Sequence, residues 1–394
     1  MSRSRTLFAL SLLAASLAGA QPPTPAPAPA PADDPAKLSF MEYDPPSTLV
    51  VAAHPVKRAK YPFVDVHSHQ FNLDETKLRD VVAAMDAMNL AVLVNLSGRG
   101  FRRIETPGGK TRFALNDPGY LRELIALGER IAPGRIVHFT NVDFSRVGGP
   151  DWPAAAVAEL EADVAAGARG LKIYKSLGMD TTDVDGRRLA VDDPRLDPIW
   201  ETCARRGLPV LIHTADPAPF WQPKTQDNER LYELIETGRY RDPAENVAWE
   251  QLIAEQHNLF RRHPRTQFVN AHLGWLGNDL GRLGRLLDEA PNVTTEIGAV
   301  LAELGRQPRF AREWLVRYQD RVLFGKDSWA PEEYPYYFRV LETADDYFPY
   351  YRRRHAFWKL YGLDLPDGVL RKLYYENALR VVPKLDRSLF PPGE

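Results

Sequence analysis

Six polar side chains that can bind a metal or transfer a proton stand at or near the ends of short apolar segments. Imidazole and carboxylate groups are common ligands of zinc and of other divalent metals, and a carboxylate can also accept a proton from water. A His-x-His pair alone is a weak signal, but here two more histidines and an aspartate end later apolar segments. The sequence therefore predicts a metal site formed by His67, His69, His213, His272 and Asp327, and Lys172 lies in the fourth of these segments.

The segment FVDVHSH at 63–69 is the first of these and is typical of a buried strand. Successive side chains of a strand alternate between its two faces. We therefore expect Asp65, His67 and His69 to share one face, while Val64 and Val66 point the other way. Two imidazoles placed in this way could hold one cation between them.

Eight short apolar segments recur along the chain, and most are separated by a helical pattern. Predicted helices include 74–88, 151–166, 243–262 and 278–289. Strands that alternate with helices pair in parallel through right-handed crossovers. The predicted strands are residues 62–68, 91–97, 135–143, 168–174, 209–214, 267–273, 292–298 and 321–327.

The count and length of these units favour an α/β fold of the (β/α)8 TIM-barrel type. An open dinucleotide-binding sheet is disfavoured because no Gly-x-Gly-x-x-Gly follows the first strand. In such barrels the chemistry lies at the C-terminal ends of the strands, which is where the six side chains fall. Residues 216–265 exceed what one helix needs and predict an insertion between strands five and six, forming a wall or lid over the mouth.

The chain resembles the amidohydrolase superfamily, in particular its amidohydrolase-related (type 2) branch. The resemblance rests on VDVHSH at 64–69, LIHT at 211–214, NAHLG at 270–274 and LFGKD at 323–327, and it runs from about residue 61 to 383. It implies a divalent metal held by His67, His69, His213 and Asp327. It also implies that Asp327 accepts a proton from metal-bound water, and that His272 either binds a second metal or handles protons.

Three roles are open for Lys172. In binuclear members a lysine at this place is carbamylated and bridges two metals, whereas mononuclear members work without it. Lys172 could then pair with a substrate carboxylate or with a carboxylate inside the barrel. The ligand set suits zinc, in one or two ions, with manganese, iron or nickel as alternatives. Glu296 departs from the expected pattern and could orient a ligand histidine or shape substrate choice.

Residues 1–20 have the pattern of a secretory signal peptide, with a basic start, a short apolar run and small residues at 18–20. The alternative is an anchor helix that stays uncleaved. Residues 21–44 are rich in proline and alanine and predict an extended, disordered linker. We therefore expect residues 45–394 to form the catalytic domain, and we expect the protein to be exported, to the periplasm or the extracellular space.

The composition of the chain limits the kinds of partner that the protein is expected to bind. The chain has 394 residues, of which 44% are hydrophobic and 26% charged, with a formal net charge of −2. Removal of the signal peptide would take away Arg3 and Arg5 and give −4, so nothing attracts nucleic acid. The mature chain contains no membrane span. Cys203 is the only cysteine, and the pattern around it favours a buried core residue over a nucleophile.

These observations predict an enzyme that acts on a small molecule. The favoured hypothesis is a metal-dependent hydrolase that cleaves an ester, lactone, amide or phosphoester with metal-bound hydroxide. The alternative is a metal-dependent nonoxidative decarboxylase of an aromatic or other carboxylic acid, which the type 2 branch also contains. Export and a lysine on the fourth strand favour the hydrolase. Residue types alone define neither the substrate nor an oligomeric state.

Overall fold

A computed structural model describes residues 37–39, 42–105, 111–355 and 358–392. The predicted signal peptide, at 1–20, and most of the predicted linker, at 21–44, lie outside these residues. Asp44–Glu394 forms one compact unit. Among the described residues, no helix combines the length and the apolar character that crossing a membrane requires.

Eight parallel strands form the centre of this unit, as far as the chain is described. They make two sheets, ordered β1-β2-β5 and β10-β9-β8-β7-β6. Parallel bridges join Thr140 to Leu171 and Ser68 to Asp327, so that the two sheets meet at both edges. The α/β prediction with parallel strands is confirmed. The strands are β1 (Phe63–Ser68), β2 (Leu90–Asn95), β5 (Ile136–His138), β6 (Leu171–Ile173), β7 (Val210–Ile212), β8 (Phe268–Asn270), β9 (Val293–Glu296) and β10 (Val322–Leu323).

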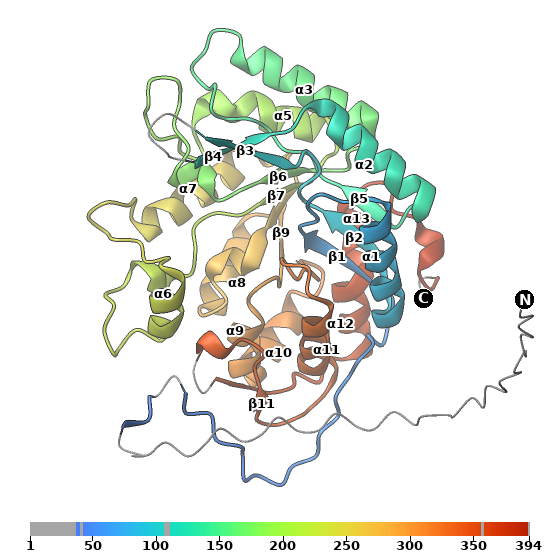
Figure 1. Cartoon of the computed structure of the whole chain (residues 1–394), viewed down its shortest axis with the longest axis vertical. Helices are drawn as coiled ribbons and strands as arrows, with labels where there is room; N and C mark the ends of the chain where they lie inside the picture. The colour runs from blue at the N-terminus through green and yellow to red at the C-terminus, as the bar shows by residue number, and fades with distance from the viewer. Residues whose placement is uncertain (1–36, 40–41, 106–110, 356–357, 393–394) are drawn as a thin grey trace, which may run out of the picture. The chain divides into compact units, whose positions relative to one another are not determined.

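Helices follow the strands in alternation and lie around them (Figure 1). Asp74 caps the first helix by accepting a hydrogen bond from Lys77 N–H, as an aspartate at this position does. The main helices are α1 (Glu75–Met88), α2 (Pro118–Ile131), α3 (Trp152–Ala166), α5 (Asp197–Arg206), α7 (Trp249–Arg262), α8 (Leu280–Glu289), α9 (Leu301–Arg306), α10 (Pro308–Arg317), α11 (Tyr334–Glu342), α12 (Asp367–Arg371) and α13 (Asn377–Val381).

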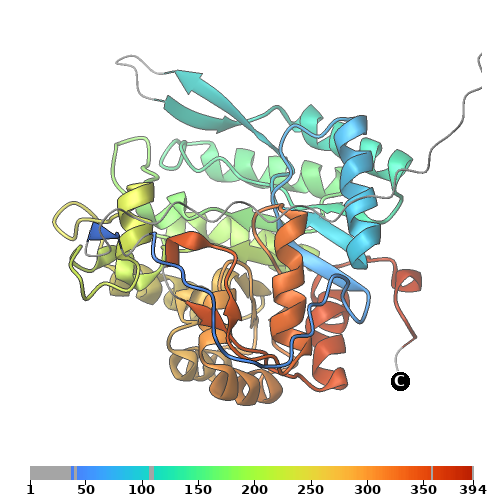
Figure 2. The same cartoon turned by 60° about the horizontal axis from the view of Figure 1, so that its bottom comes forward.

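Two segments between strands differ from a single crossover helix. The predicted insertion at 216–265 contains α6 (Leu231–Thr237) and α7, and α7 begins six residues later than the helix expected at 243–262. The predicted role of this segment as a wall or lid stays a prediction. An antiparallel hairpin of β3 (Phe101–Glu105) and β4 (Thr111–Leu115) was not predicted, and it projects beyond α2 and α3 (Figure 2).

An aromatic cluster packs β1 against β10 and the C-terminal helices, where the ring of strands closes. The Phe63 ring lies 4.8 Å from the Phe324 ring, 5.4 Å from Phe338 and 5.8 Å from Tyr374, measured between centroids. Edge-to-face aromatic pairs contribute about 0.5–1.5 kcal/mol each beyond the burial of their surface. This packing holds β1, and thus the two histidines that follow it, against the last strand.

The prediction that Asp65 shares a face with His67 is wrong. Asp65 accepts hydrogen bonds from Tyr334 O–H, at 2.6 Å, and from Lys326 N–H, at 3.1 Å. Tyr334 also lies beside Phe63, so Asp65 and Phe63 point to the same side of β1. The pairing of β1 with β2 is irregular between Asp65 and Ser68, and this breaks the alternation that places side chains on opposite faces.

Cys203 lies in α5 and is fully buried. Burial raises the pKa of its thiol to about 12, so the thiolate is not populated at neutral pH. The expectation that it is a core residue is confirmed.

Candidate metal centre

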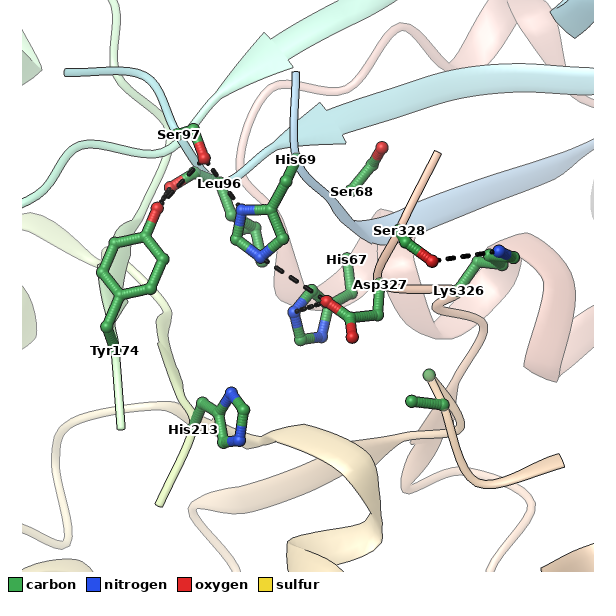
Figure 3. A network of polar contacts seen from close by, with 12 residues as sticks. His67, Ser68, His69, Leu96, Ser97, Tyr174, His213, Lys326, Asp327 and Ser328 are labelled. Atoms are coloured by element: carbon green, nitrogen blue, oxygen red, sulfur yellow. Dashed lines mark hydrogen bonds and ion pairs between the residues drawn. The ribbon is translucent and has the colours of Figure 1, made fainter. Parts of the chain in front are cut away.

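The structure brings all six predicted side chains to the C-terminal ends of the strands. Figure 3 shows His67, His69, His213 and Asp327 around one space. One ligand atom from each of His67, His272 and Asp327 lies within 4.8 Å of the other two. The remaining members are placed by their contacts: His69 Nε2 lies 3.7 Å from Asp327 Oδ1, His213 Nδ1 lies 3.3 Å from His272 Nε2, and Lys172 Nζ lies 3.3 Å from His67 Nε2.

His67 is held by Glu296, which lies at the end of β9. Its Nδ1 lies 2.9 Å from Glu296 Oε1 and donates to that carboxylate. Nε2 therefore carries the lone pair of the neutral ring, and it lies 3.5 Å from Asp327 Oδ1. The pKa of His67 lies well below its ordinary value because the ring is buried and because Lys172 is close, so the ring is neutral.

His69 is held by a chain of hydroxyl groups (Figure 3). Tyr174 O–H donates to the Leu96 carbonyl at 3.1 Å, so the Tyr174 oxygen must accept from Ser97, which lies 3.0 Å away. The Ser97 oxygen then accepts from His69 Nδ1–H at 2.8 Å. Burial and the nearby Lys172 lower the pKa of His69 to about 3. The Nε2 lone pair of His69 thus faces the same space as that of His67.

His272 and His213 are held by backbone carbonyls. His272 Nδ1–H donates to the Gly298 carbonyl at 2.7 Å, and His213 Nε2–H donates to the Ala215 carbonyl at 3.1 Å. The pKa of His213 lies well below its ordinary value because of burial, and a positive charge on His272 or Lys172 would act in the same direction. The lone pairs of His272 Nε2 and His213 Nδ1 therefore face each other across 3.3 Å.

This arrangement fits a bound cation. Each of the four imidazoles donates one ring N–H to an acceptor, and each presents its other nitrogen as a lone pair. In metal sites, the acceptor that takes a hydrogen bond from the N–H of a histidine ligand orients its ring. Two lone pairs that face each other in a buried site repel, and a cation between them removes that repulsion. The donor set of nitrogen and carboxylate ligands suits zinc or a related divalent metal.

Asp327 is the carboxylate of the cluster and keeps 32% of its side chain exposed. Its backbone N–H donates to the His67 carbonyl at 2.6 Å, and its φ of 85° is rare for a residue other than glycine. Burial alone would raise the pKa of this carboxyl, but its interaction with a positive charge on His67, His272, His69 or Lys172 more than offsets that effect. Asp327 is therefore ionised and can bind a cation or accept a proton.

Lys172 is 1% exposed. Burial lowers its pKa to about 8, although the charges of Asp327 and Glu296 oppose that effect. A fraction of its amine is thus uncharged near neutral pH.

Glu296 connects two of the histidines. Oε1 accepts from His67 Nδ1–H and also from the backbone N–H of His272, at 2.6 Å, while Oε2 accepts from Gly298 N–H. A Cβ atom at Gly325 would collide with Oε2, so glycine at 325 makes room for the carboxylate. Glu296 thereby holds the ends of β1, β8 and β9 together.

Sequence reasoning missed the groups that orient the histidines. Ser97 and Tyr174 are the last residues of the second and fourth predicted strands. That position was the one feature of the sequence that could have marked them as partners of a histidine. The carbonyl groups of Ala215 and Gly298 carry no signal, because any residue supplies a carbonyl. Trp275 was also missed: its ring stacks on His272 at 4.5 Å, and its indole N–H donates to Ala215.

The ring of parallel strands and the imidazole and carboxylate cluster at their C-terminal ends define a metal-dependent α/β enzyme. The chain belongs to the amidohydrolase family, whose sequence profile matches residues 132–384. The matched region contains Lys172, His213, His272, Glu296 and Asp327, whereas His67 and His69 precede it. A comparison with curated protein sequences finds no match.

Solved structures share the fold. A 2,6-dihydroxybenzoate decarboxylase from Rhizobium is 15% identical, with a TM-score of 0.50 over 82% of this chain and 98% of that chain. A dihydroxybenzoic acid decarboxylase from a Polaromonas species, with bound manganese and the inhibitor 2-nitroresorcinol, is 14% identical, with a TM-score of 0.50 over 82% and 96% of the two chains. At these identities the likeness concerns the fold alone.

Proposed function

We propose that this protein is a metal-dependent hydrolase that cleaves an ester, lactone, amide or phosphoester bond of a small molecule. The single observation that carries the proposal is the position of Asp327. Its ionised carboxylate lies within 3.7 Å of the Nε2 atoms of His67 and His69, and part of it remains in contact with solvent. A carboxylate in this position can take a proton from an attacking water and release it to the solvent.

The residues that would hold the cation are His67, His69, His213, His272 and Asp327. A bound divalent metal supplies a Lewis acid that lowers the pKa of water and polarises a substrate oxygen. Glu296, Ser97 and the carbonyls of Gly298 and Ala215 keep the four imidazoles in the orientation and tautomer that ligation needs. If a single ion occupies the site, His272 remains free to polarise the substrate or move a proton.

We further propose that Lys172 is carbamylated and bridges two ions. An uncharged amine adds to CO2 to form a carbamate and releases one proton, and the lowered pKa of Lys172 favours that reaction. Elemental mass spectrometry on purified protein tests this proposal. Two equivalents of metal support the bridge, whereas one equivalent contradicts it. No bound metal would contradict the proposed function as a whole.

A nonoxidative decarboxylase is the second candidate, since two structures with the same fold carry that activity in their names. The two functions differ in product. Metal-loaded protein would be assayed with aryl esters, lactones and phosphotriesters, and separately with hydroxybenzoates while CO2 is measured. Hydrolysis without CO2 release supports the hydrolase, and CO2 release from hydroxybenzoates without hydrolysis contradicts it.

We also propose export after cleavage of the signal peptide at 1–20. The basic start, the short apolar run and the small residues at 18–20 support this proposal. N-terminal sequencing of the protein from the periplasm and the medium tests it, and an intact Met1 in the cytoplasm would contradict it.

A further inference from the structure

Asp216 is a buried residue that is fixed by three side chains from other parts of the chain. It is 1% exposed. Its carboxylate accepts from Lys175 Nζ at 2.5 Å through Oδ1, and from Arg241 Nη2 at 3.2 Å through Oδ2. Its backbone carbonyl accepts from the indole N–H of Trp249 at 2.9 Å. A buried carboxylate needs such partners, because removing its charge from water is otherwise costly.

The three partners of Asp216 come from two separate parts of the fold. Arg241 and Trp249 belong to the insertion at 216–265, and Trp249 is the first residue of α7. Lys175 lies two residues after β6, at the C-terminal end of the ring of strands. Asp216 therefore ties the insertion to the end of the barrel at which the candidate metal centre lies.

Ala215, the residue before Asp216, orients a predicted metal ligand. Its carbonyl accepts from His213 Nε2–H at 3.1 Å and from the indole N–H of Trp275 at 3.1 Å. The φ angle of Ala215 is 61°, in the left-handed region that residues other than glycine rarely adopt. Such a conformation persists only where the surrounding structure enforces it. The direction of this carbonyl thus depends on contacts outside the Ala215 backbone.

The contacts of Asp216 supply that support. The Ala215 carbonyl and the Asp216 N–H belong to one planar peptide group, so the carbonyl cannot turn unless Asp216 moves. If Asp216 were released, the Ala215 backbone could relax to a negative φ and turn its carbonyl away from His213. His213 would then lose the acceptor that keeps its Nδ1 lone pair facing His272, 3.3 Å away.

We propose that Asp216 is a positioning residue for His213, and that through Asp216 the insertion at 216–265 sets the geometry of the metal centre. This inference rests on the proposed function for the presence of a metal. Asp216 acts through the peptide group that it shares with Ala215 and takes no part in bond cleavage. The insertion thereby gains a second role beside the predicted wall or lid.

A pair of matched tryptophan variants tests the proposal without any change of charge. Trp249→Phe removes the hydrogen bond to Asp216, whereas Trp221→Phe removes a similar one, from the Trp221 indole to the Val247 carbonyl at 2.8 Å, within the same insertion. The two side chains are equally buried, with 9% and 8% exposed. Trp221→Phe therefore controls for the general effect of a smaller ring in this segment.

Two measurements on the full chain report the metal centre without any need for turnover. Competition with a coloured chelator gives the affinity for zinc, and the visible absorption of the cobalt-substituted protein reports the arrangement of the ligands, since coordination geometry decides the absorption bands. Trp249→Phe should weaken zinc binding by about 2- to 10-fold, the scale of one neutral hydrogen bond, and should shift the cobalt bands. Trp221→Phe should match the wild type in both.

Asp216→Asn is the stronger perturbation, because it removes both ion pairs. We expect zinc binding to weaken by about tenfold or more, as the loss of a group that supports a ligand does elsewhere, together with a shift of the cobalt bands. The side chains of Lys175 and Arg241 are 29% and 21% exposed, so water can hydrate them and the variant should fold. Asp227→Asn, an exposed residue of the same insertion, is the control.

Wild-type affinity and cobalt bands in Trp249→Phe would overturn the proposal, even if the variant melts at a lower temperature, because a purely structural contact changes stability alone. An equal change in Trp221→Phe would overturn it as well. An effect in Asp216→Asn without one in Trp249→Phe would show that charge, and not orientation, is responsible. If Asp216→Asn does not fold, the tryptophan pair decides. Wild-type protein that binds no metal contradicts the proposed function, whereas unchanged variants of a metal-binding protein contradict this inference alone.

Discussion

His213 Nδ1 and His272 Nε2 face each other across 3.3 Å, and both nitrogens carry lone pairs because their partner nitrogens donate to the carbonyls of Ala215 and Gly298. Two strands and their loops thus hold a pair of donors in an orientation that is unfavourable without a cation. The metal is therefore expected to contribute to the stability of the fold as well as to the reaction.

Removal of the metal should lower the melting temperature. A ligand present at 100 times its dissociation constant stabilises the native state by about 2.7 kcal/mol. Differential scanning fluorimetry before and after treatment with a chelator measures the loss. Zinc or manganese should restore the melting temperature, and calcium should not, because calcium prefers oxygen ligands. An unchanged melting temperature after complete chelation would contradict the prediction.

Asp327→Asn should reduce turnover by about 10²- to 10⁴-fold, the usual contribution of a general base. The amide keeps the size of the side chain but cannot accept the proton. Turnover is measured with the best substrate from the ester, lactone and phosphotriester screen, together with metal content. Asp346→Asn, an exposed residue of the segment after α11, serves as the control. Wild-type turnover in Asp327→Asn would refute the role of Asp327 as the base.

Glu296→Gln should weaken metal binding by about 10- to 100-fold, as the loss of a partner to a ligand histidine does elsewhere. The carboxylate now accepts from three N–H groups, those of His67, His272 and Gly298. An amide has one oxygen, so its NH2 group would face one of these donors. Competition with a coloured chelator measures affinity without any need for turnover.

The matched control for Glu296 is Glu313→Gln, an exposed residue on α10. Its metal affinity should equal that of the wild type. If Glu296→Gln binds metal as tightly as this control, then Glu296 does not position the ligands.

Stability toward acid should depend on Glu233, which lies in α6. Burial alone would raise its pKa, but a hydrogen bond with His355 and the charge of Arg230 lower it to about 2. Since the folded pKa lies below that of the unfolded chain, about 4.3 for a glutamate, the stabilisation is complete above that unfolded value. It is lost progressively as the pH falls from there toward 2.

Urea unfolding of wild type and Glu233→Gln at several pH values measures this dependence. The difference in unfolding free energy between the two proteins should be largest at pH 7 and should shrink below about pH 4.5. A difference that stays constant from pH 7 to pH 3 would show that the charge of Glu233 contributes nothing.

Much of the fold could be predicted because its signals are local. A strand reveals itself by a short apolar run, and all eight parallel strands fall within or beside the predicted segments. The polar residue that ends each run belongs to the same short stretch of sequence. For this reason His213, His272 and Asp327 could be placed at one end of the strands before their distances were known. The β3–β4 hairpin was missed because its strands have no such apolar run.

The sequence by itself determined which residues reach the C-terminal ends of the strands, since the order of strands and helices decides that. The tertiary structure alone decided how they act. Glu296 and His67 are 229 positions apart, and only folding makes one the partner of the other. Asp65 does not share a face with His67, because the pairing of β1 with β2 is irregular between Asp65 and Ser68. Tautomers and partners depend on contacts between distant segments, and no local pattern encodes them.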